Sequence, residues 1–439
     1  MRTCKLFYAA SRRPFLVNIH WKDMAAFSTN TEQVWANHKT SNLRTIPRTV
    51  QVGGELVTKN QIRWDDIFPT LQTFSNLSSL IIVSVQFPLH DIFMYLESMP
   101  RLTKLSLSNI ERDSSAPCNH ASQLPSYSNS LRELTVKQMP MSKAPFLGDS
   151  GFMHIMDLLS RPGLERAEIS MDTFADLLYV FDETRYSFSE SLIYLDVRDP
   201  TFRLNDEERW QEDWCNLIHH AVHRCATVIQ HLRIWSSSHP PDPPPPLYLP
   251  ALIEYIGPHE MLSTLMFSSS ISTIWVPAPV AQCSSAFKLS ERLGAHLQHT
   301  DLRNLSVLRW SSSDIRVENI FALFPRLEEL SIQPSSPLSK RRLSHLKGAL
   351  KEMHYLRGIS ILNDTTRYKL SNSDQREILS SWKRARNTLL YVRFETKIKF
   401  LWDGKRTWEK RHFIDGQLLM PLNEERKQYT NAFCHTFLF

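Results

Sequence analysis

A short unit that occurs twice constrains the fold more than any other feature of this sequence. Residues 99–107 read MPRLTKLSL and residues 324–332 read FPRLEELSI. Before each proline, apolar residues spaced i, i+3, i+4 and i+7 predict a helix, which the proline ends. After it, the spacing LxxLxL alternates as in a strand with one buried face. A recurring unit of helix and strand predicts a repeat protein.

Degraded copies of this unit follow one another along most of the chain. With apolar substitutions allowed, they begin at Leu77, Leu102, Leu131, Leu164, Leu192, Ile229, Leu262, Leu305, Leu327, Leu356 and Leu389. The intervals average about 31 residues and are irregular. A helical stripe lies between two of them, at Phe152, Ile155, Met156 and Leu159. Stacked strand-helix units predict an α/β fold with parallel strands inside and helices outside.

The array from about residue 70 to 395 resembles the leucine-rich repeat family, specifically the long irregular repeats behind F-box domains in mushroom-forming fungi. The resemblance implies a leucine-rich repeat solenoid in the form of an irregular horseshoe. The sequence departs from the family at the position of its asparagine ladder, where residues such as Ser237 and Ser270 stand.

Residues 1–60 do not show the repeat. The segment with the step Cys4-Lys5 and the tryptophans Trp21 and Trp35 resembles the last helix and exit of a fungal F-box domain. This resemblance implies docking to the Skp adaptor of cullin ubiquitin ligases. The opening F-box helix, of Leu-Pro-x-Glu-Ile type, is missing, which suggests a truncated gene model.

Three regions are therefore expected: a partial, helical F-box-like segment with the entry to the array (1–60), irregular repeats (61–395), and a C-terminal hairpin cap with a tail (396–439). TVQV at residues 49–52 is a candidate first strand, and residues 64–68 a helix that Pro69 bends or ends. Ile398, Phe400 and Trp402 alternate before Asp403-Gly404, a strong hairpin signal.

Composition favours an intracellular protein. Of 439 residues, 42% are hydrophobic and 22% charged, and no apolar run approaches the roughly 18 residues of a membrane span. The six cysteines form no CxxC pair, as expected for reduced thiols in cytoplasm or nucleus. The N-terminus lacks acidic residues before Asp23, so a mitochondrial presequence is the alternative.

No sequence motif of an enzyme is present, and no cofactor is expected. Cys215, His219 and His223 share one edge of a helix, which suggests zinc, but no fourth ligand is evident. A solvated helix face with Cys225 buried is the favoured interpretation. The proline run at 236–246 is expected to be a stiff loop, with an SH3-type or WW-type ligand as the alternative.

Alternation along each strand directs the residues between the leucines onto the concave face. Arginine and exposed aromatic side chains anchor protein interfaces. Such residues are expected to cluster near the middle of the array and are predicted to bind protein: Tyr194, Arg198, Arg233, Trp235 and Arg309.

The sequence thus predicts a non-enzymatic receptor, a monomer within a complex, that binds a protein substrate for a ubiquitin ligase. One alternative is a repeat scaffold without a ligase link. The other is a nucleic-acid binder, based on a net charge of +6 and the basic clusters at 340–342 and 383–386. Acidic residues near both clusters favour a mixed solvated surface instead.

Overall fold

The computed structural model describes residues 16–32, 43–53, 64–83, 86–87, 96, 99–108, 111–112, 130–137, 150–170, 188–198, 222–235, 247–257, 265–267, 271–276, 302–310, 324, 326–334, 340–361, 371–395, 398–402, 408–414 and 417–418. The chain divides into two compact units, Met1–Leu247 and Tyr248–Phe439. Both are of the α/β class and contain a parallel sheet. In the described part, no helix has the length and apolar character needed to cross a membrane.

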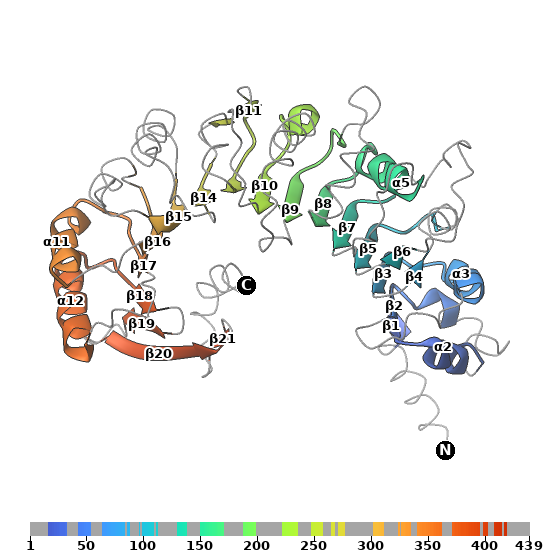
Figure 1. Cartoon of the computed structure of the whole chain (residues 1–439), viewed down its shortest axis with the longest axis horizontal. Helices are drawn as coiled ribbons and strands as arrows, with labels where there is room; N and C mark the ends of the chain where they lie inside the picture. Colours follow the sequence, from blue (N-terminus) through green and yellow to red (C-terminus); the bar gives the residue numbers. More distant parts are fainter. Residues whose placement is uncertain are drawn as a thin grey trace, which may run out of the picture. The chain divides into compact units, whose positions relative to one another are not determined.

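The first unit contains a parallel sheet in which each strand pairs with the next one along the chain (Figure 1). Its strands are β1 (Asn18–Trp21), β2 (Thr49–Gly53), β3 (Ser79–Val83), β5 (Lys104–Ser108), β7 (Glu133–Lys137), β8 (Arg166–Ser170), β9 (Tyr194–Arg198) and β10 (His231–Trp235). Outside this sheet, β4 (Gln86–Phe87) pairs with β6 (Glu111–Arg112).

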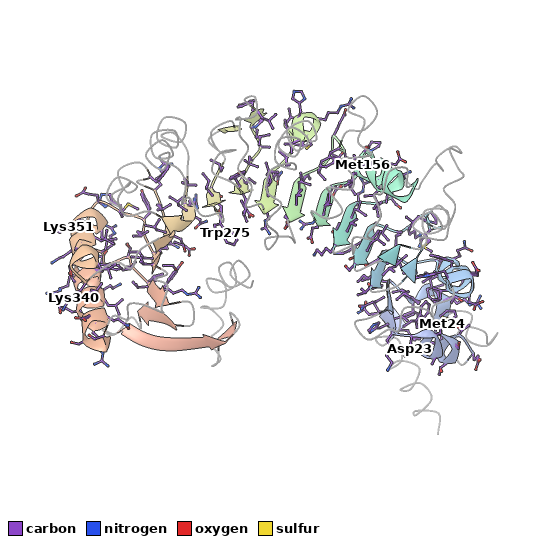
Figure 2. The ribbon with its side chains drawn as sticks, in the orientation of Figure 1. Asp23, Met24, Met156, Trp275, Lys340 and Lys351 are labelled. Carbon is purple, nitrogen blue, oxygen red and sulfur yellow. The ribbon has the colours of Figure 1, made fainter. Side chains whose placement is uncertain are left out.

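The helices of the first unit are α2 (Met24–Asn30), α3 (Trp64–Gln72) and α5 (Ser150–Leu159). Asp23, at the start of α2 in Figure 2, caps this helix by accepting a hydrogen bond from the Ala26 amide at 2.7 Å. Ile155, Met156 and Leu159 are buried on α5, which confirms these three members of the predicted stripe, while the Phe152 side chain lies outside the described part.

Pro69 does not end α3, contrary to one of the two expectations. The helix continues to Gln72 although the proline ring removes one amide donor. Phe68 before the proline and Leu71 after it are both fully buried. This burial of apolar surface on both sides of Pro69 offsets the lost hydrogen bond.

In the second unit, parallel strands again pair one with the next: β12 (Glu254–Ile256), β14 (Thr273–Val276), β15 (Asn304–Trp310), β16 (Glu329–Pro334), β17 (Gly358–Ile361) and β18 (Tyr391–Glu395). The helices α11 (Lys340–Leu350) and α12 (Asn372–Ala385) belong to this unit. A separate sheet pairs β11 (Leu247–Leu249) with β13 (Leu265–Phe267).

The second unit ends in antiparallel strands. β19 (Ile398–Trp402) pairs with β18 and with β20 (Trp408–Ile414), and β20 pairs with β21 (Gln417–Leu418). The pairing of β19 with β20 confirms the predicted hairpin strands, while the turn at residues 403–404 lies outside the described residues. β19 also pairs the outer edge of β18, which would otherwise expose unpaired backbone groups.

The chain enters successive strands through the same backbone pattern. The Leu102 amide donates to the Met99 carbonyl at 3.0 Å, and the amides of Thr103 and Lys104 then both donate to the Ser78 carbonyl at 2.9 Å. The double donation to one carbonyl recurs at β3, β7, β8, β9, β10, β14, β15, β16, β17 and β18. The repeat is therefore a property of the backbone as well as of the leucine spacing.

The leucine positions form two rows of core side chains that cross the first sheet in register. No residue in either row is more than 1% exposed. One row is Val50, Leu80, Leu105, Leu134, Ala167, Leu195 and Leu232, and the other is Val52, Ile82, Leu107, Val136, Ile169, Val197 and Ile234. The alternate residues lie on the opposite face, as alternation predicts.

The structure corrects the predicted positions of several repeats. The parallel sheet begins at β1, so the segment 1–60 contributes two strands to it and the array starts earlier than residue 61. The unit assigned to Leu262 gives β13, which lies outside the main sheet. The strands used there instead follow Leu252 and Ile271.

The unit predicted to begin at Leu305 begins three residues earlier, at Leu302. Leu305 pairs with Leu330 and Val307 with Ile332, so both lie in core rows, and the repeat begins at the buried Leu302. Counting the unit from Leu305 would place Val307 on the outward face, whereas the strand register places it in a core row. Leu302, Leu305 and Leu308 are spaced by three, so the sequence fits LxxLxL in two registers and alternation alone does not decide between them.

Candidate functional site: the polar face of strands β5 to β10

The alternate side chains of β5, β7, β8, β9 and β10 form a surface that we call the polar face. Its first row is Lys104, Glu133, Arg166, Tyr194 and His231, and its second row is Ser106, Thr135, Glu168, Asp196 and Arg233. Neighbouring parallel strands lie about 4.8 Å apart, so adjacent members of a row are within side-chain contact. The polar face thus brings together residues that are far apart in the sequence.

Tyr194 lies at the centre of the polar face between two arginines. The Arg166 Cζ atom is 3.9 Å from the centroid of the Tyr194 ring, and the Arg233 Cζ atom is 5.3 Å from it. The ring of His231 lies 5.9 Å away, centroid to centroid. Both cations are within the range of favourable interaction with an aromatic ring. We call these four residues, together with Asp196, the tyrosine cluster.

Tyr194 and Asp196 are more deeply buried than the sequence indicates. Tyr194 is 6% exposed, so the prediction of an exposed aromatic side chain is wrong at this position. The Tyr194 hydroxyl donates to Asp196 Oδ2 at 3.2 Å, and Asp196 is fully buried. The arginines of the two neighbouring strands lie over the ring, and strand alternation alone does not reveal this covering.

Burial raises the pKa of Tyr194 to about 12, and the Asp196 carboxylate adds to the increase while Arg233 opposes it. The unfolded chain loses the phenol proton near pH 10, before the folded chain does. Stability from this group is therefore complete below about pH 10 and declines above it, by about 1 kcal/mol at pH 11.

We expect Tyr194→Phe to remove that part of the alkaline destabilisation, because phenylalanine has no proton to lose. The measurement is the free energy of unfolding by urea at pH 8 and pH 11, for the wild type and the variant. Burial also raises the pKa of Cys225 to about 12, so only the difference between the two proteins reports on Tyr194. Equal alkaline losses in both would contradict the assignment.

Lysine and glutamate side chains pair across the strands around the tyrosine cluster. Lys104 Nζ lies 2.9 Å from Glu133 Oε2, and Lys137 Nζ lies 2.7 Å from Glu168 Oε2. These ion pairs are partly exposed and contribute little to stability, about 0–1 kcal/mol each. They balance charge on the polar face, which therefore is not a basic surface.

The five residues predicted to bind protein do not all meet. Tyr194 and Arg233 belong to the tyrosine cluster. Arg198 and Trp235 are paired in register at the ends of β9 and β10, and their side chains lie outside the described part. Arg309 lies in the second unit, beyond an irregularity in β15 that follows Val307, so its assignment to the same face is not supported.

Three members of the tyrosine cluster, Arg166, Asp196 and His231, are not among the five residues predicted to bind protein, although strand alternation places them on the same face. The signal that identifies them is strand register, since Arg166 pairs with Tyr194 and Tyr194 with His231. Strand register can be deduced by aligning the LxxLxL units, because the strand begins at the same position in each unit.

The second unit has a buried tyrosine on its corresponding face. Tyr391 pairs with Gly358, which in turn pairs with Glu329. Burial, followed by the Glu329 carboxylate, raises the pKa of Tyr391 well above its usual value. Ser331 and Ser360 in the next row are also buried. This face carries shorter side chains than the tyrosine cluster.

Two residues of the possible zinc set, Cys215 and His219, lie outside the described residues. His223 is exposed and Cys225 is buried, as the favoured interpretation predicted. Among the described side chains, no group of three or more potential ligands is positioned to hold a metal ion. The proline run at 236–246 also lies outside the described part.

Two lysines of the basic clusters, Lys340 and Lys383, have partners within the second unit. Lys340 Nζ lies 2.7 Å from both Asp374 Oδ1 and Glu377 Oε2. Lys383 Nζ donates to the Asn387 carbonyl at 2.6 Å and to the Leu389 carbonyl at 2.7 Å. Figure 2 shows Lys340 on α11. These contacts engage two of the cations that a nucleic-acid surface would use, while the side chains of Arg341 and Arg342 lie outside the described part.

Comparisons with known proteins give no family for this chain. A scan against models of protein families finds no match, and a search of curated proteins finds none.

Proposed function

We propose that this chain is a non-enzymatic receptor of the leucine-rich repeat type that binds a protein on its polar face. The parallel sheets and the repeated backbone entry into each strand support a repeat solenoid. The observation that carries the proposal is the tyrosine cluster, where aromatic and guanidinium groups from three consecutive strands meet. Tyrosine and arginine are the side chains that most often dominate protein interfaces.

The proposal extends to a role as substrate-recognition subunit of a cullin ubiquitin ligase. Its support is the resemblance of the N-terminal segment to the exit of an F-box domain. β1 lies within that segment and pairs with β2, so a bound adaptor would be joined directly to the repeat array. The chain itself would transfer no ubiquitin and would hold its protein substrate near the ligase.

A photo-crosslinking amino acid at Thr135 tests the receptor proposal. Thr135 is half-buried in the second row of the polar face, and the control position Arg376 is exposed on α12. We expect protein adducts from position 135, absent from position 376, that persist at about 0.5 M salt. Adducts with RNA or DNA that disappear at this salt concentration would support the nucleic-acid alternative instead.

Purified Skp adaptor tests the ligase link separately. We expect the full chain to bind it and a chain lacking residues 1–15 to lose binding. The deletion stops before β1 because removal of β1 and β2 would leave the edge of β3 unpaired. No adaptor binding by the folded full chain would reject the ligase link and leave the scaffold alternative.

A further inference from the structure

We propose that Arg166 is an anchor for a carboxylate, so that the polar face selects acidic segments of its protein partner. This inference rests on the proposed function and specifies the chemistry of the ligand. Arg166 occupies the first row of the polar face, on β8, and its side chain is exposed.

Two carboxylates that lie close to Arg166 in the sheet already have cationic partners. Glu133, its neighbour in register on β7, pairs with Lys104. Glu168, two residues further along β8, pairs with Lys137. Within the described part of the chain, Arg166 contacts the Tyr194 ring and has no carboxylate at ion-pair distance. An external carboxylate could therefore pair with this guanidinium without displacing a carboxylate of the described residues.

The contact with Tyr194 prepares Arg166 for that role. A Cζ atom 3.9 Å from the ring centroid holds the guanidinium group against the ring. Tyr194 is itself fixed by burial and by its hydrogen bond to Asp196. An ordered guanidinium loses less side-chain entropy on binding than a free one. Its N–H groups can then form two parallel hydrogen bonds with one carboxylate.

Selection from a displayed library of random dodecapeptides on the full-length chain tests this inference. We expect the selected peptides to share an aspartate or glutamate at one fixed position. Arg166→Gln should weaken a selected peptide about 10–100-fold, because it removes a charge-assisted bidentate contact. Arg166→Lys should recover only part of the loss, since a lysine ammonium group lacks the planar fork.

Three comparisons make the test specific. Arg132→Gln removes a nearby exposed arginine that already pairs with Glu165 at 3.6 Å, and it should leave peptide binding unchanged. Tyr194→Phe keeps the ring under Arg166 but removes the hydrogen bond to Asp196 that fixes the ring, so it should weaken the peptide less than Arg166→Gln does. Exchanging the acidic residue of the peptide for its amide should weaken binding to the wild type by the same factor as Arg166→Gln does. The same exchange should change binding to the Arg166→Gln variant little.

The outcomes separate this inference from the proposed function. Selected peptides that compete with the Thr135 crosslink but carry no acidic residue, or that bind Arg166→Gln unchanged, would overturn the role of Arg166 alone. A wild-type chain that selects no peptide and yields no protein adduct at Thr135 would overturn the receptor proposal as well. Equal thermal unfolding of Arg166→Gln and the wild type would confirm that the variant is folded.

Discussion

Replacing Gly358 with alanine is expected to lower the free energy of unfolding of the second unit by about 1–3 kcal/mol. A Cβ atom at this position would overlap the ring of Tyr391 on the neighbouring strand. Tyr391 is buried, so its ring has little room to move away. The measurement is urea unfolding followed by the circular dichroism of the wild type and the variant.

Gly348→Ala is the matched control for this prediction. An added Cβ at Gly348 meets no atom within 4 Å, and the residue lies inside α11. Alanine is expected to stabilise the helix there by about 0.5–1 kcal/mol. In a Tyr391→Ala background, Gly358→Ala should cost much less than in the wild type. Destabilisation of similar size by both glycine substitutions would contradict the packing argument.

The sequence predicts the parallel strands where the unit keeps its leucines, and the prediction is wrong where the unit changes. Leu102 and Leu105 are buried as expected because LxxLxL has one register that buries all three positions. The unit at Leu252 continues with Tyr255 and ends in Gly257, so it has no apolar third position. The Tyr255 side chain lies against Gly257, which shows why a glycine is accepted there.

The candidate site is only partly predictable from the sequence. Alternation places Tyr194 and Arg233 on the polar face, and the structure confirms both positions. Alternation does not predict how deeply a residue is buried, because this depends on side chains from neighbouring strands. Arg166 and Arg233 cover Tyr194, and they come from repeats on either side of it.

The basic clusters illustrate the same limit for charge. Lys340 appears in the sequence as the start of the run KRR, while its acidic partners Asp374 and Glu377 lie on α12. Acidic residues near the clusters were expected to balance the positive charge. Which of them pairs with Lys340 depends on the packing of α11 against α12, and the sequence does not reveal this tertiary contact. A run of basic residues therefore predicts a local positive charge. Whether its side chains can bind an external partner depends on the acidic residues that the fold brings next to them.

Trp382→Ala is expected to have the largest effect on stability, a loss of about 3–5 kcal/mol. Trp382 is fully buried on α12, and its Nε1 atom donates to the Leu343 carbonyl of α11 at 3.0 Å. Alanine would leave a cavity between the two helices and remove the hydrogen bond. Hydrogen exchange of the α11 and α12 amides, together with urea unfolding, measures the loss.

Two further substitutions divide this effect into its causes. Trp382→Phe keeps most of the ring volume and removes the hydrogen bond. Loss of this bond should lower the free energy of unfolding by about 1 kcal/mol. Tyr355→Ala removes an aromatic side chain that is 58% exposed in the same unit and should change stability by less than about 0.5 kcal/mol. If Trp382→Ala cost no more than Tyr355→Ala, packing between α11 and α12 would not stabilise the unit.

A loss of hydrogen-exchange protection in α11 and α12 that leaves β5 to β8 unchanged would indicate that the two units unfold separately, because a cooperative unit loses protection throughout.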